Sequence, residues 1–306
     1  MLGEAYRRYV APRCCINFET GRSVISRPPS HVGHHVTRLR AGSWSEDDDV
    51  LAAEEPLEIR LIWQDASGQT QRKNIAVTMR TPGDDFELAA GFLHGEGILR
   101  RREDVVDIAY CTDEDELQAL NIVTVTLAPG LQFDPSRLER NFYTTSSCGV
   151  CGKAALENIE TQGCEALPPG FKVSSDVIRS LPSKLRESQA VFERTGGLHA
   201  AGLFDADGTL ISLREDVGRH NAVDKLIGEA LLSGETPLAE RVLMLSGRAS
   251  FELLQKALVA RIPVVAAVGA PSSLAVELAE SFNVTLCGFV RADGLNVYTV
   301  PERVLA

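Results

Sequence analysis

Residues 242–268 read VLMLSGRASFELLQKALVARIPVVAAV, and this stretch decides the fold class. Its two apolar runs, 242–246 and 264–268, have the length and composition of buried strands. Between them, residues 250–260 place apolar side chains at helical spacing. A strand, a helix and a further strand in this order predict an α/β sheet with helices packed on its faces.

The same alternation continues on both sides of this stretch. A helix is predicted over 221–232, and another over 273–282. Strands are predicted over 284–290 and 295–300, and residues 202–213 form a predicted hairpin around Asp207-Gly208. We therefore assign 166–306 to one α/β domain, which begins after the linker signal Ala166-Leu-Pro-Pro-Gly170.

The chain before this domain shows a different pattern of predicted elements, with several strands and one helix. Strands are predicted over 57–63, 74–79, 105–109 and 121–126, with a helix that Asp84 or Asp85 caps and that ends near Gly95 to Gly97. These elements predict a small α+β domain over 36–142. Residues 1–35 lack periodicity and are expected to be a disordered extension, and Ser45 to Asp49 a solvated loop.

Composition limits the function classes. The 306 residues carry a net charge of −11, so binding to nucleic acid is not expected. No window approaches the roughly 18 apolar residues of a membrane span, and no signal peptide follows Arg7-Arg8. Seven cysteines without framework spacing indicate a reducing compartment. We expect a soluble, cytoplasmic protein that does not bind a membrane.

The run Thr144-Thr-Ser-Ser-Cys-Gly-Val-Cys-Gly-Lys153 connects the two domains, within a segment assigned to 143–165. Cys148 and Cys151 are three positions apart, and a predicted helix follows them. Free N–H groups at a helix start, with Lys153 nearby, favour the thiolate. Redox or sulfur-transfer chemistry is therefore favoured over a structural disulfide or a zinc site, because no second Cys-x-x-Cys supplies the remaining zinc ligands. We expect no resident metal.

Polar loops follow three of the predicted strands: 246–248, 269–272 and 291–294. In α/β sheets, ligands bind at the carboxyl ends of the strands. Arg219 and His220 near a helix start, and Arg248 after a strand, suit a phosphate. Neither a P-loop nor a GxGxxG motif is present. His199 alone is more readily a packed loop histidine than an acid or base.

Many separate segments together resemble the formate dehydrogenase accessory sulfurtransferase family, FdhD. The resemblance covers about 36–304 and is carried by residues 55–59, 81–83, 91–93, 96–98, 146–153, 195–199, 215–222, 224–225, 246–250, 270–275, 288–291 and 296–298. In that family the larger domain looks like a cytidine-deaminase fold with three layers. The deaminase metal site is absent here, because no His-x-Glu precedes the cysteine pair.

The resemblance implies a sulfur carrier and sulfurtransferase. A cysteine desulfurase would load sulfane sulfur onto Cys148 as a persulfide, and Cys151 would assist its transfer or release. The sulfur would pass to the molybdenum cofactor, Mo-bis(molybdopterin guanine dinucleotide), for the formate dehydrogenase catalytic subunit. By the same resemblance this cargo is bound at Phe289, Val290, Arg291, Ala292, Asp293 and Gly294, and the protein is a homodimer.

Other functions remain open at this point. A chaperone could hold the molybdenum cofactor without carrying sulfur, in which case Cys148 would be dispensable. A zinc-stabilised structural protein and a thioredoxin-like oxidoreductase also use Cys-x-x-Cys pairs. The small polar residues before Cys148 do not fit the apolar flank of a thioredoxin motif.

Overall fold

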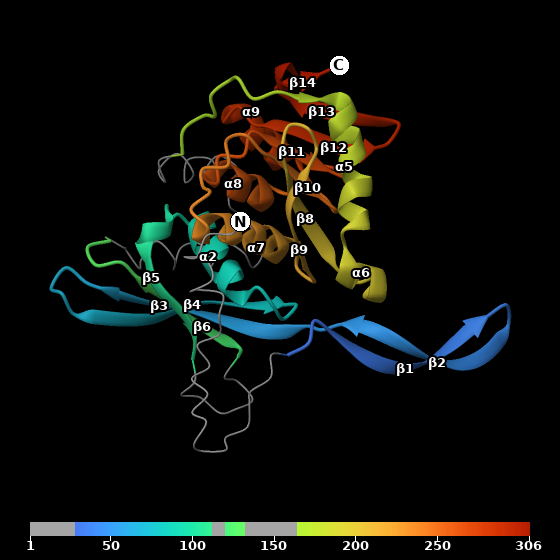
Figure 1. Ribbon diagram of the computed structural model, residues 1–306, viewed down its shortest axis with the longest axis horizontal. Coiled ribbons are helices and arrows are strands. Elements are labelled where there is room, and N and C mark those ends of the chain that lie inside the picture. The colour runs from blue at the N-terminus through green and yellow to red at the C-terminus, as the bar shows by residue number, and fades with distance from the viewer. Residues whose placement is uncertain (1–27, 112–119, 132–163) are drawn as a thin grey trace.

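The computed structural model describes residues 28–111, 120–131 and 164–306 (Figure 1). Cys148 and Cys151 lie outside these residues, as does nearly all of the segment 143–165. None of the helices in the described ranges combines the length and apolar character that a membrane span needs.

The large sheet has six strands in the order β13-β12-β11-β10-β8-β9. Strands β10, β11 and β12 are parallel neighbours, whereas β8, β9 and β13 pair antiparallel. The strands are β8 (His199–Phe204), β9 (Leu210–Asp216), β10 (Val242–Leu245), β11 (Val264–Ala267), β12 (Thr285–Arg291) and β13 (Gly294–Thr299). The predicted order of strands and helices from 202 onward is confirmed.

Helices cover both faces of this sheet. Alternate side chains along β10 separate the two cores, since Leu243 and Leu245 face one and Val242 and Met244 the other. The first core contains α7 (Arg219–Leu232), α8 (Phe251–Val259) and α9 (Ser273–Ser281), and the second contains α5 (Ser175–Glu187). Figure 1 shows α5 on the side of the sheet opposite to α7 and α8. The fold is thus mixed α/β, and its kinship with cytidine deaminases stays a prediction.

A second sheet, with the order β4-β3-β6-β5, forms the smaller unit. Its elements are β3 (Glu55–Gln64), β4 (Thr70–Arg80), α2 (Asp85–Gly95), the 3-10 turn Arg102–Asp104, β5 (Val105–Tyr110) and β6 (Ile122–Leu127). All four predicted strands and the helix are confirmed. Asp84 precedes the helix at φ 53° and its side chain makes no capping bond, so the predicted cap is wrong in detail.

The two units share an interior. Helices α2 and α7 cross so closely that a Cβ on Gly91 would lie 1.9 Å from the Asp224 carbonyl oxygen, and one on Gly228 would lie 1.8 Å from that of Glu87. Leu231 of α7 also belongs to the core of the smaller sheet. Glycine is therefore required at both crossing positions, and the two units form one body at this contact.

The expectations for residues 28–52 need correction. Strands β1 (His31–Arg40) and β2 (Ser43–Ala52) form an antiparallel hairpin, here called the arm, that extends from the body (Figure 1). Within the described residues, the first strand begins at His31, in the segment expected to be disordered, and Ser45 to Asp49 is part of a strand rather than a loop. The apolar alternation that reveals a half-buried strand is absent here, because most side chains of the arm are exposed.

Short elements complete the described chain. They are β7 (Val173–Ser174), α6 (Ala190–Thr195), the 3-10 turn Pro301–Arg303 and β14 (Val304–Leu305), which pairs with β7.

Candidate functional site

The loops after β10 and β11 meet at one edge of the large sheet, as the sequence predicts. The Gly269 N–H donates to the Gly247 carbonyl oxygen at 2.8 Å, and the Ser272 N–H donates to that of Ala249 at 3.0 Å. The Phe289 N–H reaches the Gly269 carbonyl oxygen at 3.1 Å, which adds β12 to the same edge. Carboxyl ends of parallel strands thus converge on one place.

The antiparallel strands bring further residues to this edge. His199 begins β8 and pairs with Asp216, the last residue of β9, so both lie beside the end of β10. Helix α7 then starts at Arg219 and His220, as predicted. We define the sheet-edge site as His199, Arg219, His220, Arg248, Ser250, Glu252 and the loop 269–272.

A buried network holds the start of α7 in place. The Lys225 ammonium lies 2.8 Å from a carboxylate oxygen of Asp216, and both side chains are almost fully buried. Asp216 also accepts bonds from the N–H groups of Thr81 at 3.1 Å and Gly218 at 2.8 Å. Lys225 donates to the Thr81 carbonyl oxygen at 2.9 Å. The smaller unit therefore fixes the position of the sheet-edge site.

The sequence pattern predicts the helix that carries Lys225 but does not reveal this network. Its partners are separated in sequence, and Thr81 lies more than a hundred residues before Asp216. Asn221 strengthens the same junction by donating to Asp216 at 3.0 Å and to the Met79 carbonyl oxygen at 2.7 Å.

Arg219 differs from Lys225 although both lie on α7. Its Nε is buried and has no hydrogen-bond partner among the described residues. The preceding Gly218 provides no side-chain cap, so the first N–H groups of α7 also receive no side-chain acceptor from it. Uncapped N–H groups beside an arginine form a ready site for an anion.

His220 faces Glu252 and Ser250 on α8. Its Nε2 lies 3.8 Å from a carboxylate oxygen of Glu252 and 3.4 Å from the Ser250 hydroxyl. The interaction with His220 is the largest cause that lowers the pKa of Glu252 from 4.5 to about 2. Ser250 is the N-cap residue of α8, but its side chain makes no cap bond. Sequence reasoning did not single out Glu252, which no motif marks.

His199 is half-buried against Gly247, where a Cβ would lie 3.4 Å from its Nδ1. Burial, and then the positive charges of Arg219 and His220, hold the pKa of His199 below its ordinary value of 6.5. The His199 ring thus packs against Gly247, as expected for a packed loop histidine. It also lies close to Arg219 and His220. A neutral imidazole between cations can accept a proton or a hydrogen bond.

The segment Phe289–Gly294 is the end of β12 and its turn into β13. Phe289 is 46% exposed and has φ 52°, whereas the Val290 side chain is buried in the core beside α5. Arg291 donates to the Val268 carbonyl oxygen at 2.8 Å, which ties the turn to the end of β11. Arg248 is exposed.

The other two side chains of this turn, Ala292 and Asp293, are exposed, and Gly294 is half-buried. The Ala292 carbonyl oxygen accepts a bond from Arg179 of α5 at 3.2 Å. The turn therefore offers backbone groups and exposed side chains to a ligand, and Val290 can contribute only its backbone.

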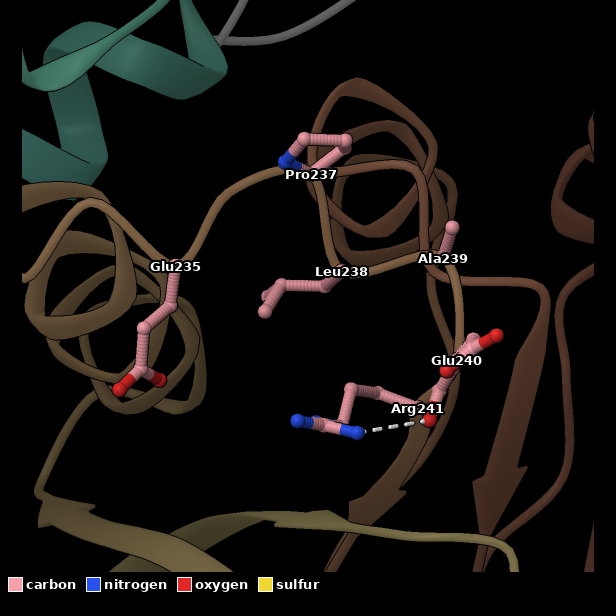
Figure 2. A pocket seen from close by; sticks show the side chains of 6 residues that line it. All are labelled: Glu235, Pro237, Leu238, Ala239, Glu240 and Arg241. Atoms are coloured by element: carbon pink, nitrogen blue, oxygen red, sulfur yellow. Dashed lines mark hydrogen bonds between the residues drawn. The ribbon is translucent and has the colours of Figure 1, made fainter.

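A surface pocket elsewhere is lined by Glu235 and residues 237–241, between α7 and β10 (Figure 2). Arg241 points into it and donates to the Glu240 carbonyl oxygen at 3.1 Å (Figure 2). Because Arg241 directly precedes β10, the pocket lies at the amino end of this strand, opposite to the sheet-edge site. Within the described ranges, no three His, Cys, Asp or Glu side chains are grouped to hold a metal ion.

Comparison with known proteins agrees with these features. The model of the FdhD/NarQ family matches residues 52–305. The sulfur carrier protein FdhD of Streptomyces coelicolor is 53% identical over 273 residues, which are 88% of this chain and 94% of the relative. That of Sulfolobus acidocaldarius is 43% identical over 269 residues, or 88% of this chain and 96% of the relative.

A solved structure is similar as well. The crystal structure of a protein described as a formate dehydrogenase accessory protein from Desulfotalea psychrophila superposes with a TM-score of 0.70. It is 27% identical and covers 90% of this chain and 100% of its own. On these matches, the chain belongs to the FdhD/NarQ family.

Proposed function

We propose that this chain carries sulfur as a persulfide on Cys148 and delivers it to a molybdenum cofactor with guanine dinucleotides, for use by formate dehydrogenase. One observation supports the ligand half of the proposal most directly: three loops and a helix start bring Arg219, His220 and Arg248 to one sheet edge. The relatives' description as sulfur carriers supports the other half.

The sulfur step follows ordinary thiol chemistry. The Cys148 thiolate attacks the outer sulfur of a persulfide on a cysteine desulfurase, and the donor's S–S bond breaks. The donor leaves as a thiolate, so the sulfane sulfur moves without net oxidation or reduction. Cys151 assists the later transfer or release.

The cargo fits the sheet-edge site in charge and in hydrogen bonding. A dinucleotide brings phosphates, which the unpartnered Arg219 Nε and the N–H groups of α7 can bind. Residues 289–294 lie next to the loop 269–272 and would hold another part of the cargo. The cargo is a substrate in transit rather than a resident cofactor.

Three finer points belong to the same proposal. The protein acts in the cytoplasm, it works as a homodimer, and its larger unit is related to cytidine deaminases. A chaperone that binds the cofactor without carrying sulfur is the competing function, and it needs only the sheet-edge site.

Mass spectrometry distinguishes these two functions. The purified protein is incubated with a cysteine desulfurase and cysteine, and the peptide that contains Cys148 is weighed. We expect one added sulfur atom, lost in Cys148→Ala and retained on Cys148 in Cys151→Ala. Absence of added sulfur while a known carrier is loaded in parallel would favour the chaperone. The chaperone also predicts that Cys148→Ala still activates formate dehydrogenase in cells that lack their own carrier.

A further inference from the structure

The arm has few contacts with the rest of the described chain. Strands β1 and β2 form a two-stranded sheet of their own, and α6 is the neighbour that packs on β2. An isolated two-stranded hairpin is only marginally stable in water. Leu39 and Trp44, which are directly opposite near the tip, are 55% and 69% exposed. A hairpin of two ten-residue strands with an exposed apolar tip is therefore stabilised when its tip and an edge are covered by a partner.

The two outer edges of the arm differ in charge. Strand β2 carries Glu46, Asp47, Asp48 and Asp49 and no basic residue, whereas β1 carries no carboxylate. Arg38 of β1 already lies 3.4 Å from Asp47 across the hairpin. Two β2 edges would therefore bring eight carboxylates together, while two β1 edges would not. The open backbone groups of β1 are the ones that can accept another strand.

A second copy of this chain suits the β1 edge. In an antiparallel pair of strands, side chains of directly opposite residues lie on the same face of the sheet. A two-fold axis between the Val36 residues of two β1 strands is compatible with this geometry. Leu39 then faces Gly33 of the second copy, and Arg38 faces His34 of the second copy. The arginines of the two strands lie at opposite ends and do not meet.

This register also covers the apolar tip. A Cβ on Gly33 would have no atom within 4 Å, so there is space beside it for a leucine. Trp44 and Leu39 of one copy, with Gly33 and Val50 of the other, form one row across the sheet, because Val50 pairs with Gly33. The row occurs twice by symmetry.

We infer that β1 pairs antiparallel with β1 of a second copy about a two-fold axis at Val36, which gives a four-stranded β2-β1-β1-β2 sheet. This inference rests on the homodimer proposed above and assigns its interface. It places the dimer contact on the arm, outside the residues 52–305 that match the family model.

Substitution on the axis tests the inference. In Val36→Lys, the lysine faces Asp47 of its own chain, so the hairpin keeps a favourable pair, but two lysines meet at the axis. Light scattering with size-exclusion chromatography should give twice 33.2 kDa for the natural protein and for Val36→Thr, and 33.2 kDa for Val36→Lys. The emission of Trp44 should shift to longer wavelength in Val36→Lys, while Trp63 is 8% exposed in either case.

Mixing supplies a control for folding. Val36→Asp alone should also be monomeric, and equal amounts of Val36→Lys and Val36→Asp should form a dimer because opposite charges then meet at the axis. A monomeric natural protein, a dimeric Val36→Lys or a mixture that stays monomeric would each overturn the inference. Persulfide loading of Cys148 in Val36→Lys should equal that of the natural protein, so that this test is separate from that of the sulfur carrier.

Discussion

Two cations of helix α7, Lys225 and Arg219, lie in opposite surroundings. Lys225 is buried and neutralised by Asp216, and the pair joins the two units of the protein. Arg219, near the start of the same helix, has a buried Nε without a partner among the described residues. The charge of Lys225 therefore holds the two units together, whereas the charge of Arg219 is the one that we propose binds a ligand.

Loss of the ion pair between Lys225 and Asp216, which joins the two units, should give the largest effect on stability. Lys225→Met leaves Asp216, which is 0% exposed, without its cation, and we expect a loss of about 3–5 kcal/mol in the free energy of unfolding. Arg219→Met should change it by no more than about 0.5 kcal/mol. Urea unfolding of the two variants measures both values, and equal losses would contradict the distinction between the two cations.

The helix crossing at the junction gives the next largest effect. Gly91→Ala forces α2 and α7 apart, because the new Cβ meets the Asp224 carbonyl oxygen, and should cost roughly 1–3 kcal/mol. Gly197→Ala is the matched control, since a Cβ there finds its nearest neighbour at an ordinary 3.8 Å. If thermal unfolding shows the same stability for both variants, the close crossing is wrong.

A smaller effect is expected at the sheet-edge site in acid. The lowered pKa of Glu252 means that its interaction with His220 stabilises the fold above about pH 4.5 and that this contribution is lost as the pH falls towards about 2. His220→Ala should raise the pKa of Glu252 towards 4.5, as carbon NMR of the carboxyl group can measure. An unchanged titration would show that His220 does not hold this carboxylate.

The sequence predicts the parts of this molecule in which buried strands and helices alternate along the chain. The strands at 242–246 and 264–268 and the helix between them are confirmed within two residues, and their loops converge as expected. The arm was missed because Ser45 to Asp49 is polar throughout, and an exposed strand has no apolar period. The network around Asp216 was missed because it joins residues far apart in sequence.

The site was predicted in part for the same reason. Arg219 and His220 could be placed at a helix start from the pattern, since this is local information. Glu252 and the position of His199 among the cations depend on how β8, α7 and α8 meet. Cys148 and Cys151 were identified from their spacing and lie outside the described residues, so their roles stay predictions.

Calorimetry with guanosine diphosphate tests the central claim most directly, namely that the open cations of the sheet edge bind the nucleotide part of the cargo. We expect Arg219→Met to bind at least about tenfold more weakly than the natural protein, because a charge-assisted hydrogen bond to phosphate contributes roughly 1.5–3 kcal/mol. Equal affinity of the natural protein and Arg219→Met would contradict the claim.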